Sequence, residues 1–154
     1  MAITITTAMP TSFKVEILKA VHNFTASTGN TFKIALFVST ASGSGTYGAA
    51  TTNYSQMGAD ELATATGYTR PGNTLTSVTP VADGTTAICD FADTTWSSAT
   101  FTTSGALIYN STASGAACAV LSFGGDQQVS SGDFTIQFPT AAAATAIIRI
   151  ASVS

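Results

Sequence analysis

The fold is decided by residues 31–40, which read TFKIALFVST. Within this segment large apolar side chains recur at every second position, at Phe32, Ile34, Leu36 and Val38. A period of two places alternate side chains on one face of a β-strand. The segment is also rich in residues that favour strands. It therefore predicts a β-strand and marks the point at which the chain changes from helix to sheet.

The second half of the chain repeats short segments of the same kind, separated by polar turns. The segments lie at residues 75–81, 85–91, 106–109, 117–123, 134–138 and 146–150, and two of the turns at residues 110–115 and 124–126. Short strands at this spacing are typical of antiparallel sandwiches and barrels. We therefore expect a mainly β protein, an antiparallel β-sandwich or a flattened barrel. The 154 residues fit a single domain, residues 1–154.

Before residue 31 the apolar period is helical. Large apolar side chains occur at Phe13, Ile17, Leu18, Val21 and Phe24. The pattern predicts one N-terminal amphipathic helix over about residues 12–24. Thr11 or Ser12 is expected to cap its first turn, with Glu16 near the positive end of the helix dipole. His22 is expected to be a partly exposed residue of this helix.

Two segments are candidates for contact with other molecules. Residues 1–10 could form an N-terminal arm in which Ile3 and Ile5 reach a neighbouring subunit by strand addition, or could fold back on the chain's own sheet. Residues 41–59 are rich in Gly, Ser and Thr and predict a flexible surface loop. Tyr47 and Tyr54 in this loop are candidate contact residues, although a solvent-exposed tether is the simpler interpretation.

Charged residues make up only 8% of the chain, against about 25% in an ordinary soluble domain. Net charge is −3, and the five basic residues are scattered along the sequence. Five isolated cations do not make a surface for nucleic acid or anionic lipid, so we expect neither as a partner. A charge-poor surface of small hydroxyl and methyl groups suits a protein that packs beside many copies of itself or of a partner.

Groups that could carry catalysis are few. His22 is the only histidine, and no nucleophile motif accompanies it. Asp60 and Glu61 are adjacent, so their side chains are expected to diverge on a short helical turn. The pairs Asp90 with Asp93 and Asp126 with Asp133 could hold Ca²⁺ but lack the spacing of a calcium loop, and capping of turns is the simpler interpretation. Cys89 and Cys118 are expected to be buried small hydrophobes, with a disulfide as the alternative. We therefore expect no catalytic residue, no metal, no cofactor and no enzymatic activity.

Several ordered blocks of sequence carry a resemblance. They are Gly67-Tyr68 with PGNTL at 71–75, DFADTTW at 90–96, GALIYN at 105–110, FGGD at 123–126 and GDFTIQF at 132–138. Together they resemble a family of small virion structural proteins of tailed double-stranded DNA phages, similar to capsid decoration or cement proteins. Membership implies a structural protein, and the blocks read as turns and core residues.

The resemblance implies a role and a location. We expect a virion protein on the capsid exterior, made in the host cytoplasm, that binds the major capsid protein and stabilises the capsid lattice. A homotrimer is favoured and a dimer is possible, since closed rings fit positions of local symmetry. The alternative is a tail-associated module that binds a receptor or glycan through the 41–59 loop with Tyr47 and Tyr54.

Overall fold

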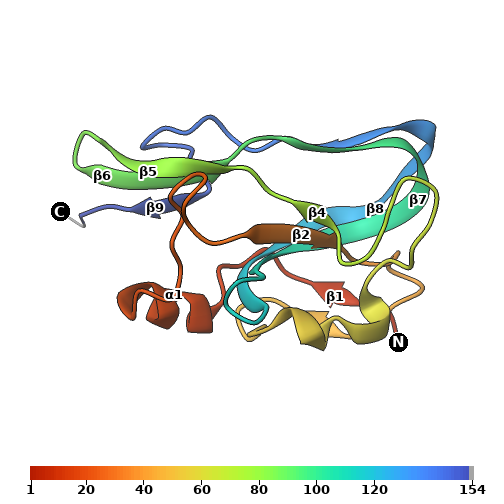
Figure 1. The fold of residues 1–154 in the computed structure, drawn as a ribbon. Coiled ribbons are helices and arrows are strands. Elements are labelled where there is room, and N and C mark those ends of the chain that lie inside the picture. Colours follow the sequence, from red (N-terminus) through yellow and green to blue (C-terminus); the bar gives the residue numbers. More distant parts are fainter. Residues whose placement is uncertain (153–154) are drawn as a thin grey trace.

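The central sheet organises the molecule. The computed structural model describes residues 1–152, and its central sheet has the strand order β4-β2-β7-β8, with every neighbouring pair antiparallel (Figure 1). These strands are β2 (Phe32–Leu36), β4 (Asn73–Thr74), β7 (Thr94–Asn110) and β8 (Ala116–Ile136). The strand predicted over residues 31–40 is confirmed as β2, and it lies inside the sheet between β4 and β7.

Both faces of the central sheet are buried. Along β2, Ile34 and Leu36 belong to one hydrophobic cluster, whereas Ala35 and the following Phe37 belong to another. Alternate residues of a strand point to opposite faces, so each cluster lies on its own side of the sheet. The sheet is therefore the middle layer of the molecule, which explains why β2 contains a single polar residue, Lys33.

The first cluster fills the space between the central sheet and a second sheet of strand order β5-β6-β9. Its strands are β5 (Ser77–Asp83), β6 (Thr86–Phe91) and β9 (Ile148–Ile150). Phe91 from β6 lies 5.6 Å, centroid to centroid, from Phe32 of β2, so aromatic rings join the two sheets. The mainly β, sandwich-like fold is confirmed, and the strands do not close into a barrel.

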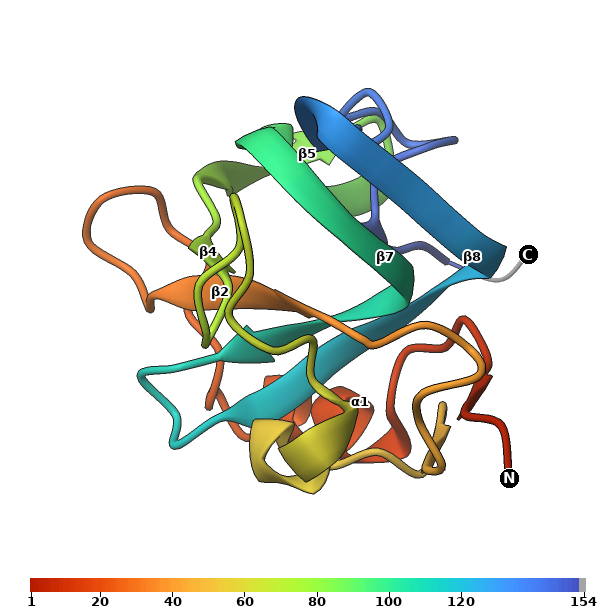
Figure 2. The same cartoon turned by 90° about the vertical axis from the view of Figure 1, so that its right-hand side faces the viewer.

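Strands β7 and β8 are longer than the sequence predicts. The turn expected at residues 124–126 lies inside β8, where the register steps from the pair Thr103–Gln127 to the pair Gly105–Ser122. Residues 123–126 bulge out of the ladder there, with Gly124 at φ +76°. Beyond this kink β7 and β8 continue side by side as a two-stranded ribbon (Figure 2). The glycines that suggested a turn therefore bend one long strand.

The opposite face of the central sheet is covered by the N-terminal arm and by residues 41–60. This layer contains β1 (Thr4–Ile5), β3 (Thr46–Tyr47), and the 3-10 turns η1 (Tyr54–Gln56) and η2 (Gly58–Asp60). β1 pairs in parallel with β3, and Ala8 forms a bridge with Val120 of β8. Of the two possibilities for the arm, folding back on the chain's own sheets is the one observed.

The helix α1 (Thr11–Leu18) is shorter than the predicted 12–24. Pro10 occupies the N-cap position, so the expected capping by Thr11 or Ser12 is wrong. Glu16 lies beyond the first turn, so its expected place at the positive end of the dipole is also wrong. At the other end Ala20 has φ +57°, a left-handed conformation that stops a helix.

Two hydrogen bonds close the helix C-terminus. The N–H of Val21 donates to the carbonyl of Glu16 at 3.0 Å, and the N–H of Ala20 donates to Ile17 at 3.1 Å. This pair of bonds defines a Schellman motif. The chain leaves the helix axis at this point, so Val21 and Phe24 keep the apolar spacing of a helix without being part of one.

Candidate functional site

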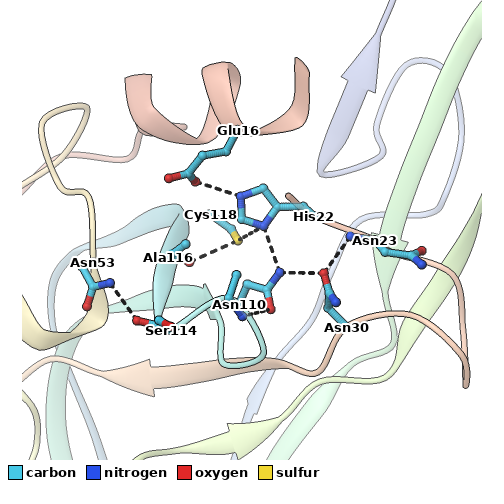
Figure 3. A network of polar contacts seen from close by, with 10 residues as sticks. Glu16, His22, Asn23, Asn30, Asn53, Asn110, Ser114, Ala116 and Cys118 are labelled. Atoms are coloured by element: carbon cyan, nitrogen blue, oxygen red, sulfur yellow. Dashed lines mark hydrogen bonds and ion pairs between the residues drawn. The ribbon is translucent and has the colours of Figure 1, made fainter. Parts of the chain in front are cut away.

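His22 is a buried polar side chain that lies on the segment after α1 and not on the helix. Its side chain is 0% exposed, so the expectation of a partly exposed helix residue is wrong. Figure 3 shows it between α1 and the ends of β7 and β8. Nε2 lies 2.9 Å from Oε2 of Glu16, and Nδ1 lies 3.0 Å from Nδ2 of Asn110. The imidazole therefore joins the helix to the central sheet.

Asn110 fixes the tautomer of the neutral ring. Its Oδ1 accepts a hydrogen bond from the backbone N–H of Ala113 at 3.1 Å. Its Nδ2 must therefore be the donor, and it donates to Oδ1 of Asn30 at 2.9 Å and to Nδ1 of His22. Since Nδ1 accepts, the proton of the neutral imidazole resides on Nε2 and is donated to Glu16. Each hydrogen-bonding group of the ring is satisfied.

Cys118 lies beside the same ring. Its Sγ is 3.9 Å from Nδ1 of His22 and 3.6 Å from the carbonyl oxygen of Ala116. The order thiol, imidazole, carboxylate is the order of a nucleophile with its base and orienting acid. The thiol, however, is only 1% exposed, and burial raises its pKa well above the usual range. A protonated, enclosed thiol neither attacks a substrate nor binds a metal readily.

Aromatic rings pack around the histidine. The ring centroids of Phe13, Phe24 and Phe32 lie 4.9, 6.2 and 6.4 Å from that of the imidazole. In such surroundings a polar group is stable only when it is hydrogen-bonded. The network of Glu16, His22 and Asn110 is therefore a structural connection between α1 and β7.

A second buried polar centre is formed by Asp60, which is 8% exposed. Its carboxylate accepts hydrogen bonds from the backbone N–H groups of Ser44 and Gly45 at 3.0 and 2.7 Å. The hydroxyl of Tyr47 donates to it at 2.9 Å. Burial, followed by the hydrogen bond to Asp60, raises the pKa of Tyr47. Asp60 thus holds the 41–60 segment in place around one carboxylate.

Glu61 faces different partners, as expected for adjacent residues on a short turn. The hydroxyls of Tyr54 and Tyr68 donate to its two oxygens at 2.6 and 2.9 Å. Nε of Arg70 lies 3.5 Å from Oε2, and this guanidinium also donates to the backbone carbonyl of Glu61. Burial raises the pKa of both tyrosines. Each carboxylate of the Asp60–Glu61 pair therefore has its own set of donors.

Contrary to expectation, none of the four candidate contact residues is fully exposed: Ile3 and Tyr47 are buried, and Ile5 and Tyr54 are partly buried. Ile3 and Tyr47 are 5% and 4% exposed and lie in the second hydrophobic cluster, with Ile5 packed against it. The ring of Tyr54 stacks on Tyr109 at 4.4 Å. The expectation that residues 41–59 contribute no core is wrong, because Tyr47 and Met57 are buried there. Their polar and apolar contacts are internal to the chain.

Most of the remaining aspartates cap backbone groups. Asp93, Asp126 and Asp133 accept from the N–H groups of Phe138, Thr40 and Ser98, in that order. Asp90 is buried and accepts from Phe91, while its other oxygen has no hydrogen-bond partner within residues 1–152. Across the described part of the chain, no three His, Cys, Asp or Glu side chains are arranged to hold a metal ion. No helix there has the length and apolar character to cross a membrane.

Sequence reasoning missed the His22 network because its members are distant in the chain. Asn110 and Cys118 lie 88 and 96 positions after His22. Only the sheet topology brings them to the segment that follows α1. Cys118 was correctly expected to be buried, as was Cys89, and both are free thiols. Nothing in the local sequence around either residue indicates the histidine as a neighbour.

Comparison with known proteins yields no relative. No protein-family model matches the chain, and no curated protein and no solved structure match it either. Function is therefore argued from the surface of the molecule itself.

The outer edge of β8 is the clearest such feature. β8 is the last strand of the central sheet and pairs only with β7 along its length beyond residue 126. Within residues 1–152, no strand covers the other edge of this half of β8. Its residues 127–132 read QQVSSG and carry no charge. The backbone groups of an uncovered strand edge are available to another strand.

Proposed function

We propose that this chain is a non-enzymatic structural protein of a phage virion, most specifically an outer capsid decoration protein that binds the major capsid protein and stabilises the capsid lattice. The observation that carries the proposal is the uncovered edge of β8. A free strand edge binds a partner through main-chain hydrogen bonds, which demand a matching strand and little else. This is a way to attach a small protein to a repeated subunit.

The composition of the surface supports the same role. With 8% charged residues, the molecule presents few groups that repel a close neighbour or that lose much hydration when covered. Individually weak contacts suffice on a lattice, because an oligomer that engages several subunits gains by avidity. A homotrimer is the favoured assembly, and a dimer is the alternative.

The bulge at Ser131 limits the length of the partner strand. Ser131 has φ +51°, and the register steps there from the pair Ala99–Gly132 to the pair Phe101–Val129. Bulges twist an edge and interrupt pairing. The flat part of the edge is therefore residues 127–130, and a partner adds a short strand. A short strand is compatible with reversible placement on a shell and with resistance to uncontrolled edge-to-edge aggregation.

A tail-associated receptor- or glycan-binding module is less well supported. That role would use Tyr47 and Tyr54 as exposed aromatic contacts. The hydroxyls of both residues donate to buried carboxylates, and their rings are packed against Phe37 and Tyr109. Aromatic groups held in this way are not available to stack on a sugar.

Quantitative mass spectrometry of purified virus particles tests the role. We expect the copy number of this chain to be comparable with that of the major capsid protein. A copy number far below it places the chain in the tail or at a vertex, and absence from particles removes the proposal altogether.

Edge variants test the mode of attachment. Lysine on an edge strand opposes pairing, so Gln128→Lys and Ser130→Lys together should abolish binding to capsids that lack the protein. Thr85→Lys, at the tip of the β5–β6 hairpin, is the matched control and should bind normally. If the edge variant and the control variant bind capsids equally, the β8 edge is not the attachment surface.

A further inference from the structure

A groove between α1 and β9 has the form of a second binding surface. Its walls are Ile17 and Leu18 of α1 and Ile148 and Ile150 of β9, with Lys14 and Arg149 at its borders, and it encloses about 360 Å³. A smaller apolar cavity of about 120 Å³ adjoins it and shares Ile17, Ile148 and Ile150 as lining residues. We call the two together the α1–β9 groove.

Apolar side chains at this groove are unusually exposed. Leu18 is 88% exposed and Ile150 is 59% exposed, and both line the groove. Apart from Met1, every large hydrophobic residue that is exposed in residues 1–152 lies on α1, just after it, on β5 or on β9. Burying such side chains removes apolar area from water and is favourable. Exposed apolar side chains that line one groove, as Leu18 and Ile150 do, mark an interaction surface.

The charge of the groove indicates its occupant. Lys14 and Arg149 line it, and no acidic residue within 1–152 lines either part. The whole chain has five basic and eight acidic residues. Two of the five basic residues therefore line this groove, whereas none of the eight acidic residues does, although Glu16 lies on the same helix. The groove is the basic face of an acidic protein.

We propose that the α1–β9 groove binds a segment of another protein in which aliphatic side chains are interspersed with carboxylates. The aliphatic groups would fill the groove against Leu18 and Ile150, and the carboxylates would meet Lys14 and Arg149. The guanidinium of Arg149 is already oriented, since Nη1 donates to the carbonyl oxygen of Ala144 at 2.6 Å. This inference goes beyond the proposed function and does not depend on it, because different elements form the groove and the β8 edge.

A second copy of the chain fits this surface poorly. A symmetric dimer places the same face on both partners. Lys14 and Arg149 of each copy would then face those of the other, and like charges at a contact oppose association. A partner segment with carboxylates avoids this repulsion and neutralises the basic residues.

Two synthetic peptides of about 12 residues, about three helical turns, provide the test. Both carry leucines at helical spacing, and one has glutamates and the other lysines at the remaining positions. Fluorescence anisotropy should show binding of the glutamate peptide and none of the lysine peptide. Lys14→Glu should weaken binding of the glutamate peptide by about tenfold or more, because one charged contact is lost. Lys33→Glu makes the same change of charge on β2 and should leave the affinity unaltered.

Leu18→Ser tests the apolar part, and its high exposure means that the fold does not depend on it. We expect this variant not to bind the glutamate peptide, and we expect its urea unfolding curve to be unchanged. Failure of the glutamate peptide to bind, equal binding of both peptides, or equal affinity of Lys14→Glu and Lys33→Glu would overturn the proposal. Binding to phosphatidylglycerol vesicles in place of the peptide would assign the groove to a membrane surface. Self-association that Leu18→Ser abolishes would assign it to a second copy.

Discussion

His22 Nε2 lies 2.9 Å from Glu16 Oε2, although the two residues are separated by the end of a helix. The left-handed conformation of Ala20 reverses the chain between them and returns the imidazole to the helix that has just ended. An intact helix over residues 12–24 would place residues six positions apart on different faces. The helix end is therefore what creates the buried histidine and its link to Asn110.

The hydrogen-bond pattern predicts which nitrogen of His22 carries the proton. Nδ1 accepts from Asn110, so the neutral ring should be the Nε2–H tautomer. Long-range ¹H–¹⁵N correlation spectra of the imidazole measure this directly. A protonated Nδ1 at neutral pH would contradict the orientation assigned to Asn110.

Replacing His22 tests the energetic value of the same network. His22→Phe suits the surrounding aromatic rings but removes the partner of the Glu16 carboxylate and one of the two acceptors of Asn110 Nδ2. We expect it to lower the free energy of unfolding by about 2 kcal/mol. Thr25→Ala, at an exposed position nearby, should change it by about 0.5 kcal/mol or less. Urea unfolding followed by circular dichroism compares them, and equal stabilities would show that the network contributes little.

Substitutions at Asp60 and at two tyrosines are expected to lower the free energy of unfolding by graded amounts. Asp60→Ala leaves the N–H donors of Ser44 and Gly45 unpaired, removes the charged acceptor of Tyr47, and should cost about 3 kcal/mol. Tyr47→Phe removes one hydrogen bond to a charged acceptor and should cost about 1.5 kcal/mol. Tyr109→Phe is the control, since its hydroxyl donates to the neutral carbonyl of Pro71, and it should cost about 1 kcal/mol.

The order of this series is its essential outcome. If Tyr109→Phe destabilised the protein more than Tyr47→Phe, the carboxylate would not be the organising group of the 41–60 segment. Chemical denaturation of the three variants in the same buffer decides between the two orders.

The strands could be predicted from sequence because burial imposes a period of two on the chain. Residues 31–40 show that period, and β2 lies there. The polar sites could not be predicted, because their partners are joined by topology and not by spacing. Ala20 is the clearest case: a left-handed alanine has no sequence signature, and it alone shortens the helix and moves His22 into the core. Asp60 and Tyr47 likewise look like loop residues until the segment folds over the central sheet.

Gly72 and Gly84 are expected to differ in how well they tolerate substitution by alanine. Gly72 and Gly84 both have positive φ, +84° and +60°. A Cβ at Gly72 would overlap the carbonyl oxygen of Ile34 in β2, whereas a Cβ at Gly84 meets nothing within 4 Å. Gly84→Ala should therefore cost only the left-handed conformation, about 1 kcal/mol. Gly72→Ala should cost about 3 kcal/mol or more, because the strand must also move. Thermal unfolding of the two variants measures the difference. Equal losses of stability would show that β2 can shift without an energetic penalty.

Because the two thiols are buried, the protein is expected to lose stability at alkaline pH. Burial, followed by the charge of Asp90, raises the pKa of Cys89 from 9.0 to about 12, and burial also raises that of Cys118. The folded state therefore keeps its thiol protons where the unfolded chain has released them. With fewer protons bound to the unfolded state, the free energy of unfolding falls as the pH increases, beginning near the unfolded pKa of about 9. Below that pH the contribution of the thiols is fully present.

Urea unfolding across about pH 8 to about pH 11 measures this decline. The buried tyrosines add to it above about pH 10, since their ordinary pKa is one unit higher than that of a thiol. The interval from about pH 9 to about pH 10 therefore belongs mainly to the cysteines. Cys89→Val has no proton to release and should show a smaller decline in that interval, whatever its stability at neutral pH. An unchanged decline would mean that Cys89 titrates equally in the folded and unfolded states, and hence that its thiol is open to water.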